Sequence, residues 1–311
     1  MSTAIVWFRR NLRLSDNPAL EAAANSGHPL LAVYVLDELD QGGASRWWLH
    51  HSLAALTGDL REHGGRLTLL KGEPSQELAK LARASNAAAV YFQRRYEPQA
   101  KQQEEQLDDA LGDDLELCAN DAATLVHPTR VLTQSDTPYK VFTPFWRSAS
   151  ECADPGKPQP VPATLDFAEI DAGLTLDELE LLPTKPDWAS GLRDTWSPGE
   201  DGAHARLDLL EDTVGNYKQH RDRPDLDNTS RLSPHLHFGE ISPRQAWHAV
   251  HRMGMDARSS TGADALLRQL FWRDFSSYML FHFPDLPDTP LKPEFAKFPW
   301  ADDDNALRAW Q

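Results

Sequence analysis

The fold is decided at the start of the chain, where residues 4–20 read AIVWFRRNLRLSDNPAL. The first five residues of this stretch form a continuous apolar run of the kind that fills a buried strand. Asn17 followed by Pro18 then predicts a helix start, because Asn is a favoured N-cap and proline suits the first helical position. A strand that runs through a polar loop into a helix is the opening unit of an α/β domain.

The same alternation of apolar run and amphipathic stretch continues to about residue 130. After AIVWF, strands are predicted at LLAVYVL, LTLLKG, AAAVYFQ and LELCAN. The intervening stretches predicted as helices are residues 18–25, 45–63, 75–84 and 99–111. Five strands separated by helices predict a doubly wound, mostly parallel, Rossmann-like sheet with helices on both faces.

The pattern changes twice after this α/β segment. Between about residues 154 and 202, proline recurs every two or three residues among many acidic ones, which predicts an extended connector with one short helical turn. Beyond it, apolar residues recur at three- and four-residue spacing, which is the helical period. We therefore divide the chain into an α/β domain at 1–130, a connector at 131–202 and an all-α domain at 203–311.

Composition indicates a soluble, cytoplasmic protein. The 311 residues are enough for two domains, and a hydrophobic content of 41% can fill ordinary cores. The formal charge of −16 argues against a protein that binds nucleic acid through its overall field. We expect no membrane association, because no apolar run reaches the ~18 residues of a membrane span and no leader precedes the first strand.

No metal site is predicted. Cys118 and Cys152 have neither the number nor the spacing of a disulfide framework or a ligand set. His235 and His237 alternate in the sequence, but residues two apart on a helix point about 200° away from each other. We therefore do not expect this histidine pair to hold one ion.

Three arginines, Arg9, Arg10 and Arg13, stand where the first strand ends. Ligands of a doubly wound sheet bind at the carboxyl ends of the strands, so an anion could be held there. The glycine fingerprint GxGxxG and the phosphate loop GxxxxGK[ST] are both absent, which argues against a dinucleotide or triphosphate bound in those ways. Pairing of the arginines with carboxylates at a domain seam is the interpretation that we favour.

A second polar cluster consists of Thr229, Ser230 and Arg231, immediately before a predicted helix that begins Ser-Pro. Two hydroxyls, a guanidinium and a helix N-terminus within five residues suit a phosphate or a pyrophosphate. A capped turn in which Arg231 pairs with Asp225 or Asp227 accounts for the same residues equally well.

A third polar cluster lies on a predicted helix within residues 266–284. Gln269, Trp272 and Arg273 are spaced i, i+3 and i+4, so they share one helical face. An amide, an aromatic plane and a guanidinium together can stack on and hydrogen-bond to a base or a flavin ring. For the helix taken alone, a core tryptophan flanked by a surface pair is the simpler interpretation.

Three stretches together resemble the DNA photolyase and cryptochrome family in their order and spacing. They are VWFRRNLRLSDNPAL, YKQHRDRPDLDNTSRLSPHLHFGEISPRQ and QLFWRDFSSYMLFHFPDLPDTPLKPEFAKFPW, within which TSRLSPHL and WRDF are specific to the family. The resemblance implies a flavoprotein with an antenna domain, a connector and an all-α domain that holds FAD. It also implies light-driven repair, in which reduced FAD gives an electron to a cyclobutane pyrimidine dimer flipped out of DNA. A cryptochrome-like blue-light photoreceptor and an inactive fragment are the alternatives.

By position, the resemblance implies roles for particular residues. The positions that contact the flavin are matched by Tyr217, Thr229, Ser230, Arg231, Leu232, Ser233, Gln269 and Arg273. Gln269 and Trp272 match positions at the DNA substrate, where the tryptophan would stack on the flipped lesion. Trp300 matches the outermost tryptophan of the chain that photoreduces the flavin. Damaged DNA is the implied partner, and a monomer is expected.

Three departures from the family pattern bear on these expectations. Gln269 stands where many dimer-repairing members have glutamate, and an amide cannot give a proton as a carboxyl can, so the lesion type stays open. Gln99 and Ala100 occupy the folate-antenna positions, so an antenna chromophore could be methenyltetrahydrofolate, a deazaflavin or a flavin, or could be lacking. The chain stops at ALRAWQ where family members continue, so these 311 residues alone are expected to bind FAD weakly or not at all.

Overall fold

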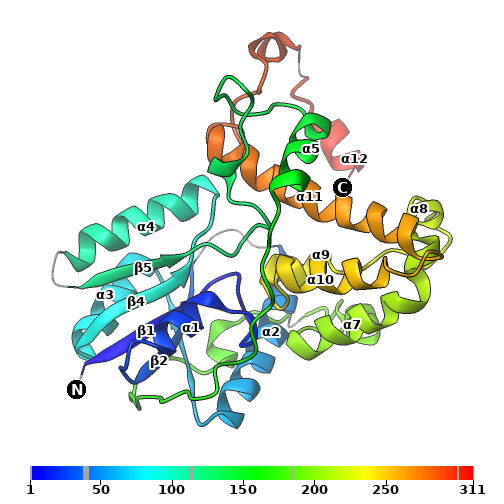
Figure 1. The fold of residues 1–311 in the computed structure, drawn as a ribbon. Coiled ribbons are helices and arrows are strands. Elements are labelled where there is room, and N and C mark those ends of the chain that lie inside the picture. Colours follow the sequence, from blue (N-terminus) through cyan, green and yellow to red (C-terminus); the bar gives the residue numbers. More distant parts are fainter. Residues whose placement is uncertain (1, 38–41, 113–114, 184, 300, 311) are drawn as a thin grey trace.

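The structure is a computed structural model that describes residues 2–37, 42–112, 115–183, 185–299 and 301–310. Its first part is a five-stranded parallel sheet in the order β3-β2-β1-β4-β5 (Figure 1). The strands are β1 (Thr3–Phe8), β2 (Leu30–Leu36), β3 (Leu67–Lys71), β4 (Ala87–Gln93) and β5 (Glu116–Asn120). The predicted doubly wound α/β fold is confirmed, because β1 lies in the middle and the chain winds outward to either side.

Helices cover both faces of this sheet. The helices are α1 (Pro18–Ala24), α2 (Gly43–Glu62), α3 (Pro74–Ala84) and α4 (Pro98–Leu111). Side chains of β1 alternate between two cores: Val6 and Phe8 pack with α1 and α2, whereas Ile5 and Trp7 pack with α3 and α4. Because both faces are covered, all thirteen residues of β1 and β2 are buried, which explains why the two strands are apolar from Ala4 and from Leu30 onward.

The segment predicted as a connector is extended for most of its length but contains helices. The helices within it are α5 (Phe142–Cys152), η2 (Asp177–Leu179) and α6 (Ser190–Thr195). A further short helix, η1 (Pro128–Arg130), lies just before the segment. Leu174 bonds to the backbone of Leu69 and thereby covers the outer edge of β3. In α5, which the sequence analysis did not predict, Phe142, Phe145 and Ala149 are buried in the core of the helical part. This spacing buries one face of a single helix.

The helical part follows as predicted. Its elements are α7 (Glu200–Thr213), η3 (Val214–Asn216), α8 (Tyr217–His220), α9 (Ser233–Phe238), α10 (Pro243–Met253), α11 (Ser260–His282), η4 (Pro293–Lys297) and α12 (Asp304–Trp310). Ser242 and Gln245 form a capping box at the start of α10. The long helix α11 packs against α5, α8 and α10, so it organises this core. None of the described helices is long and apolar enough to cross a membrane.

Two of the arginines after β1 are held by carboxylates, as the sequence analysis favoured. Arg9 Nη1 lies 2.6 Å from Glu104, and Arg10 Nη1 lies 3.1 Å from Glu97. Both carboxylates come from α4 or the residue before it, so these pairs fix the loop after β1 to its neighbour within the α/β part.

The third arginine joins the α/β part to the helical part through carbonyl groups. Arg13 is buried and donates to the carbonyl oxygens of Gly239 at 2.9 Å and Asp16 at 2.7 Å. Gly239 has a φ of +73°, and a Cβ there would lie 2.0 Å from the carbonyl oxygen of Arg10. The two parts therefore meet so closely that only glycine fits at this point of the seam.

Candidate active site

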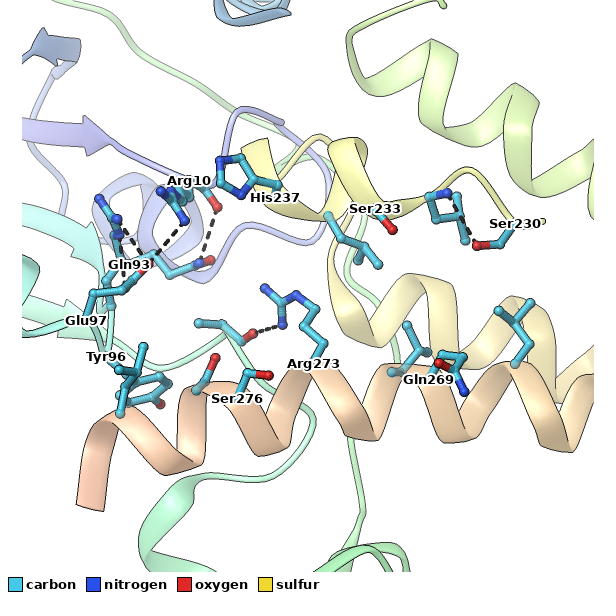
Figure 2. A pocket seen from close by; sticks show the side chains of 18 residues that line it. Arg10, Gln93, Tyr96, Glu97, Ser230, Ser233, His237, Gln269, Arg273 and Ser276 are labelled. Carbon is cyan, nitrogen blue, oxygen red and sulfur yellow. Dashed lines mark hydrogen bonds and ion pairs between the residues drawn. The ribbon is translucent and has the colours of Figure 1, made fainter. Parts of the chain in front are cut away.

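A cavity of about 410 Å³ lies where α9 and α11 face the carboxyl end of the sheet (Figure 2). The segment before α9 contributes Ser230 and Leu232 to its lining, and α9 itself contributes Ser233. Gln269 and Arg273 reach it from α11, one helical turn apart. Residues that are more than thirty positions apart in the sequence thus meet around one space, which we call the first cavity.

The segment before α9 is held from outside the first cavity. Arg206 of α7 donates to the carbonyl oxygens of Ser230 and Thr229, each at 3.0 Å. Arg231 has a φ of +52°, and its guanidinium lies 2.8 Å from Asp227. The sequence left open whether Arg231 binds a phosphate or pairs with Asp225 or Asp227. In the structure it pairs with Asp227, while Ser230 lines the cavity.

Five of the eight residues at flavin-matched positions line the first cavity. These are Ser230, Leu232, Ser233, Gln269 and Arg273. The other three are not among the described lining residues: Thr229 is exposed, Arg231 lies over the ring of Trp196, and Tyr217 is buried in the core of the helical part. Trp300, matched to electron transfer, lies outside the described residues.

Trp272 does not join Gln269 and Arg273 at the first cavity. Its ring stacks on Phe142 of α5, with centroids 3.6 Å apart and an interplanar angle of 10°. The residue remains 44% exposed, so part of it is still open to solvent. Of the three residues spaced i, i+3 and i+4, Gln269 and Arg273 therefore line the first cavity together, whereas Trp272 packs against α5.

The far wall of the first cavity carries charges that the sequence analysis did not assign to a site. Arg10, Arg95 and Glu97 enter it from the α/β part, and His237 enters it from α9. Burial, followed by the charges of Arg10 and Arg95, lowers the pKa of His237, so its ring is neutral at pH 7. Arg95 and Glu97 directly follow β4, so the rule that ligands gather at strand ends could have indicated them.

A second cavity, of about 520 Å³, lies on the other side of this charged wall. It opens at the carboxyl ends of β1 and β2 and is lined by the aromatic side chains of Trp7, Phe8, Tyr34 and Phe238. Gln99 and Ala100, the residues at the folate-antenna positions, also line it. Gln103 accepts a hydrogen bond from Arg9 at 3.1 Å and donates one to Asp37 at 2.9 Å, which orders the polar side of this cavity.

Metal ligation is not indicated by the described part of the chain, which contains no group of three or more His, Cys, Asp or Glu side chains arranged to hold an ion. The Nδ1 atom of His235 contacts the carboxylate of Glu240, whereas His237 faces the two cavities. The two histidines therefore point to different surroundings.

Comparison with known proteins agrees with this arrangement. Residues 4–164 match the family model described as DNA photolyase, and residues 266–311 match the FAD binding domain of DNA photolyase. The chain belongs to the DNA photolyase family. The second match begins in α11, the helix that carries Gln269 and Arg273, while the 230–238 segment that lines both cavities lies between the two matched ranges.

Similar proteins include both photolyases and cryptochromes. The chain is 40% identical to a deoxyribodipyrimidine photo-lyase of Agrobacterium fabrum, covering 98% of this chain and 65% of that protein. It is 31% identical to Cryptochrome-1 of Arabidopsis thaliana, with coverages of 99% and 47%. A crystal structure of a bacterial class III photolyase from Agrobacterium tumefaciens superposes with a TM-score of 0.92 at 39% identity, over all of this chain and 65% of that one. The chain therefore spans about two thirds of the length of these photolyase relatives.

Proposed function

We propose that this chain carries the flavin-binding and lesion-facing site of a deoxyribodipyrimidine photo-lyase, which repairs cyclobutane pyrimidine dimers in DNA with light. The observation that supports this most is the first cavity, which brings the 230–233 segment together with Gln269 and Arg273. These two groups of residues lie in the sequence motifs that resemble the family most closely.

The lining of the first cavity fits FAD. Its volume is within the range of about 300–1,000 Å³ that is usual for small-molecule sites. The hydroxyls of Ser230 and Ser233 and the guanidinium of Arg273 are suited to phosphate oxygens, and Leu232 and Leu266 offer apolar contact to a flat ring. Bound FAD in its reduced form would supply the electron that opens the pyrimidine dimer on illumination.

Two side chains have proposed roles toward the flipped dimer. Gln269 would donate a hydrogen bond from its amide to a thymine carbonyl, which holds the lesion without transferring a proton. Trp272, which remains partly exposed, would offer its ring for stacking, supported from behind by Phe142. Trp300 keeps its proposed role in electron transfer to the flavin.

The proposed partner is damaged DNA, bound by a monomer in the cytoplasm. The described lining of the first cavity includes three guanidiniums, those of Arg10, Arg95 and Arg273, and one carboxylate, that of Glu97. This local excess of positive charge favours a phosphate backbone, although the chain as a whole has a formal charge of −16. The second cavity is the proposed place for an antenna chromophore, which could be methenyltetrahydrofolate, a deazaflavin or a flavin, because its aromatic lining residues suit a flat ring.

A blue-light photoreceptor of the cryptochrome type is the second candidate. The observation that favours it is Gln269, because an amide at this position cannot share a proton with the lesion as a carboxyl group can. A repair assay separates the two candidates. The chain is incubated with excess reduced FAD and an oligonucleotide containing one thymine dimer, and restored thymines are quantified after blue light.

We expect light-dependent restoration that is lost in Gln269→Leu and kept in the control Gln106→Leu, which alters an exposed glutamine of α4. Flavin binding, followed separately by flavin fluorescence, is expected to persist in Gln269→Leu because the four other lining residues at flavin-matched positions, Ser230, Leu232, Ser233 and Arg273, remain. Bound flavin without any restoration of thymine in the unsubstituted chain would refute the repair function and favour the photoreceptor.

A further inference from the structure

The two cavities are separated by a wall that is one layer of side chains thick. Four residues line both cavities: Arg10, Arg95, Glu97 and His237. Any group that binds to this wall from one side therefore touches side chains that also face the other side.

The carboxylate of Glu97 is the centre of this wall. Its Oε1 atom accepts from Arg10 Nη1 and from Arg95 Nη2, each at 3.1 Å, and its Oε2 atom accepts from Arg95 Nε at 3.3 Å. Although burial works in the opposite direction, the charges of Arg95 and Arg10 lower the pKa of Glu97 to about 2. Two guanidiniums thus converge on one small anion, in the geometry in which arginine also binds phosphate oxygens.

This ion cluster is accessible from the cavities. The side chains of Arg10 and Glu97 are 40% and 34% exposed, so solutes in the cavities reach them. Glu97 also immediately precedes the fourteen-residue helix α4, whose first amides add positive potential at the same place. Nothing covalent or deeply buried fixes the carboxylate, whereas a phosphate carries more charge and more acceptor oxygens.

We propose that Arg10 and Arg95 form an anion site that Glu97 closes in the free protein, and that the phosphate group of a nucleotide-type ligand takes the place of the carboxylate. This inference rests on the two cavities being ligand sites, as proposed above, but not on DNA repair. A phosphate that enters from one cavity displaces Glu97 and binds to Arg10 and Arg95. Because these two side chains also line the other cavity, they are then no longer free to bind an anion there. Occupancy of the two cavities is therefore coupled, and the coupling acts equally in both directions.

The test uses inorganic pyrophosphate and the chain without FAD or DNA. Isothermal calorimetry is expected to show weak binding to the unsubstituted chain and binding about tenfold tighter to Glu97→Gln, because the two guanidiniums are no longer occupied by a charged group. The control Glu105→Gln removes an equal charge from an exposed position of α4 that pairs with Lys101, and it should bind like the unsubstituted chain. The double substitution Arg95→Gln with Glu97→Gln should lose the gain.

A second readout locates the bound anion. In Glu97→Gln, the ring NMR signals of His237 should shift with the concentration dependence found by calorimetry, while those of His28, which precedes β2 at the opposite end of the sheet, should not.

Two narrowing substitutions identify the cavity from which the anion enters. Ala100→Leu narrows only the second cavity and Ser277→Leu narrows only the first, so the substitution that weakens pyrophosphate binding marks the side of entry. Equal affinity of Glu97→Gln and the unsubstituted chain, an unshifted His237, or binding weakened by neither narrowing substitution would overturn the proposal.

Discussion

The seam between the α/β part and the helical part contains a buried polar cluster whose removal should be costly. Glu240 follows α9 and is fully buried. Its carboxylate accepts from Trp48 Nε1 at 2.9 Å and from the hydroxyl of Ser52, both on α2, and it contacts Nδ1 of His235. One side chain thus holds α9, which lines the first cavity, against a helix of the other part.

Glu240→Ala leaves these three polar groups buried without their partner. Each buried polar group that loses its hydrogen-bond partner costs about 1–3 kcal/mol. We expect Glu240→Ala to lower the free energy of unfolding by about 4 kcal/mol. Glu240→Gln keeps one carbonyl oxygen as an acceptor and should lose about 1–2 kcal/mol.

Urea unfolding followed by circular dichroism measures these losses by linear extrapolation. The control Glu105→Ala removes a glutamate from an exposed position and should change stability by less than about 0.5 kcal/mol. Because Glu240 positions α9, its alanine variant should also weaken ligand binding in the first cavity. A loss below about 1 kcal/mol in Glu240→Ala would refute the reasoning that this cluster locks the two parts together.

Two further predictions concern α11. Burial raises the pKa of Asp274 to about 7, so its contribution to stability is full below about pH 4, where an unfolded aspartate titrates, and is lost as the pH rises to 7. Asp274→Asn, which can still accept from the amides of Leu125 and Val126, should therefore gain stability over the unsubstituted chain between about pH 4 and pH 7. A difference that does not change with pH would contradict this. Trp272→Ala removes the stack on Phe142 and should cost about 1–3 kcal/mol with faster hydrogen exchange in α5, and unchanged exchange there would show that the stack does not hold that helix.

Much of the α/β part could be predicted because the burial of each strand shows directly in its own residues. A strand such as β2, buried on both faces of a covered parallel sheet, must be apolar throughout, and LLAVYVL gives its limits without ambiguity. Helix α5 could not be predicted in the same way. Its only strong feature is the burial of Phe142, Phe145 and Ala149, and that burial depends on α11, more than a hundred residues later.

The candidate site was predictable in part for a similar reason. Local spacing placed Gln269 and Arg273 on one face of α11, and both reach the first cavity. The same spacing did not show that Trp272 would stack on Phe142, because that partner comes from a distant helix. Arg95 and Glu97 could have been indicated by their place after a strand, but their meeting with Arg10 could not, because it depends on β4 lying beside β1 in the sheet.

The central claim is that the first cavity is the flavin site, and it can be tested by NMR on the isotope-labelled chain with millimolar FAD, a concentration that detects even weak binding. We predict that shifted amide and side-chain signals cluster at Ser230, Leu232, Ser233, Gln269 and Arg273, and that Leu266→Trp, which fills this cavity from α11, removes the shifts. Shifts confined to other surfaces, or unchanged by Leu266→Trp, would contradict the account.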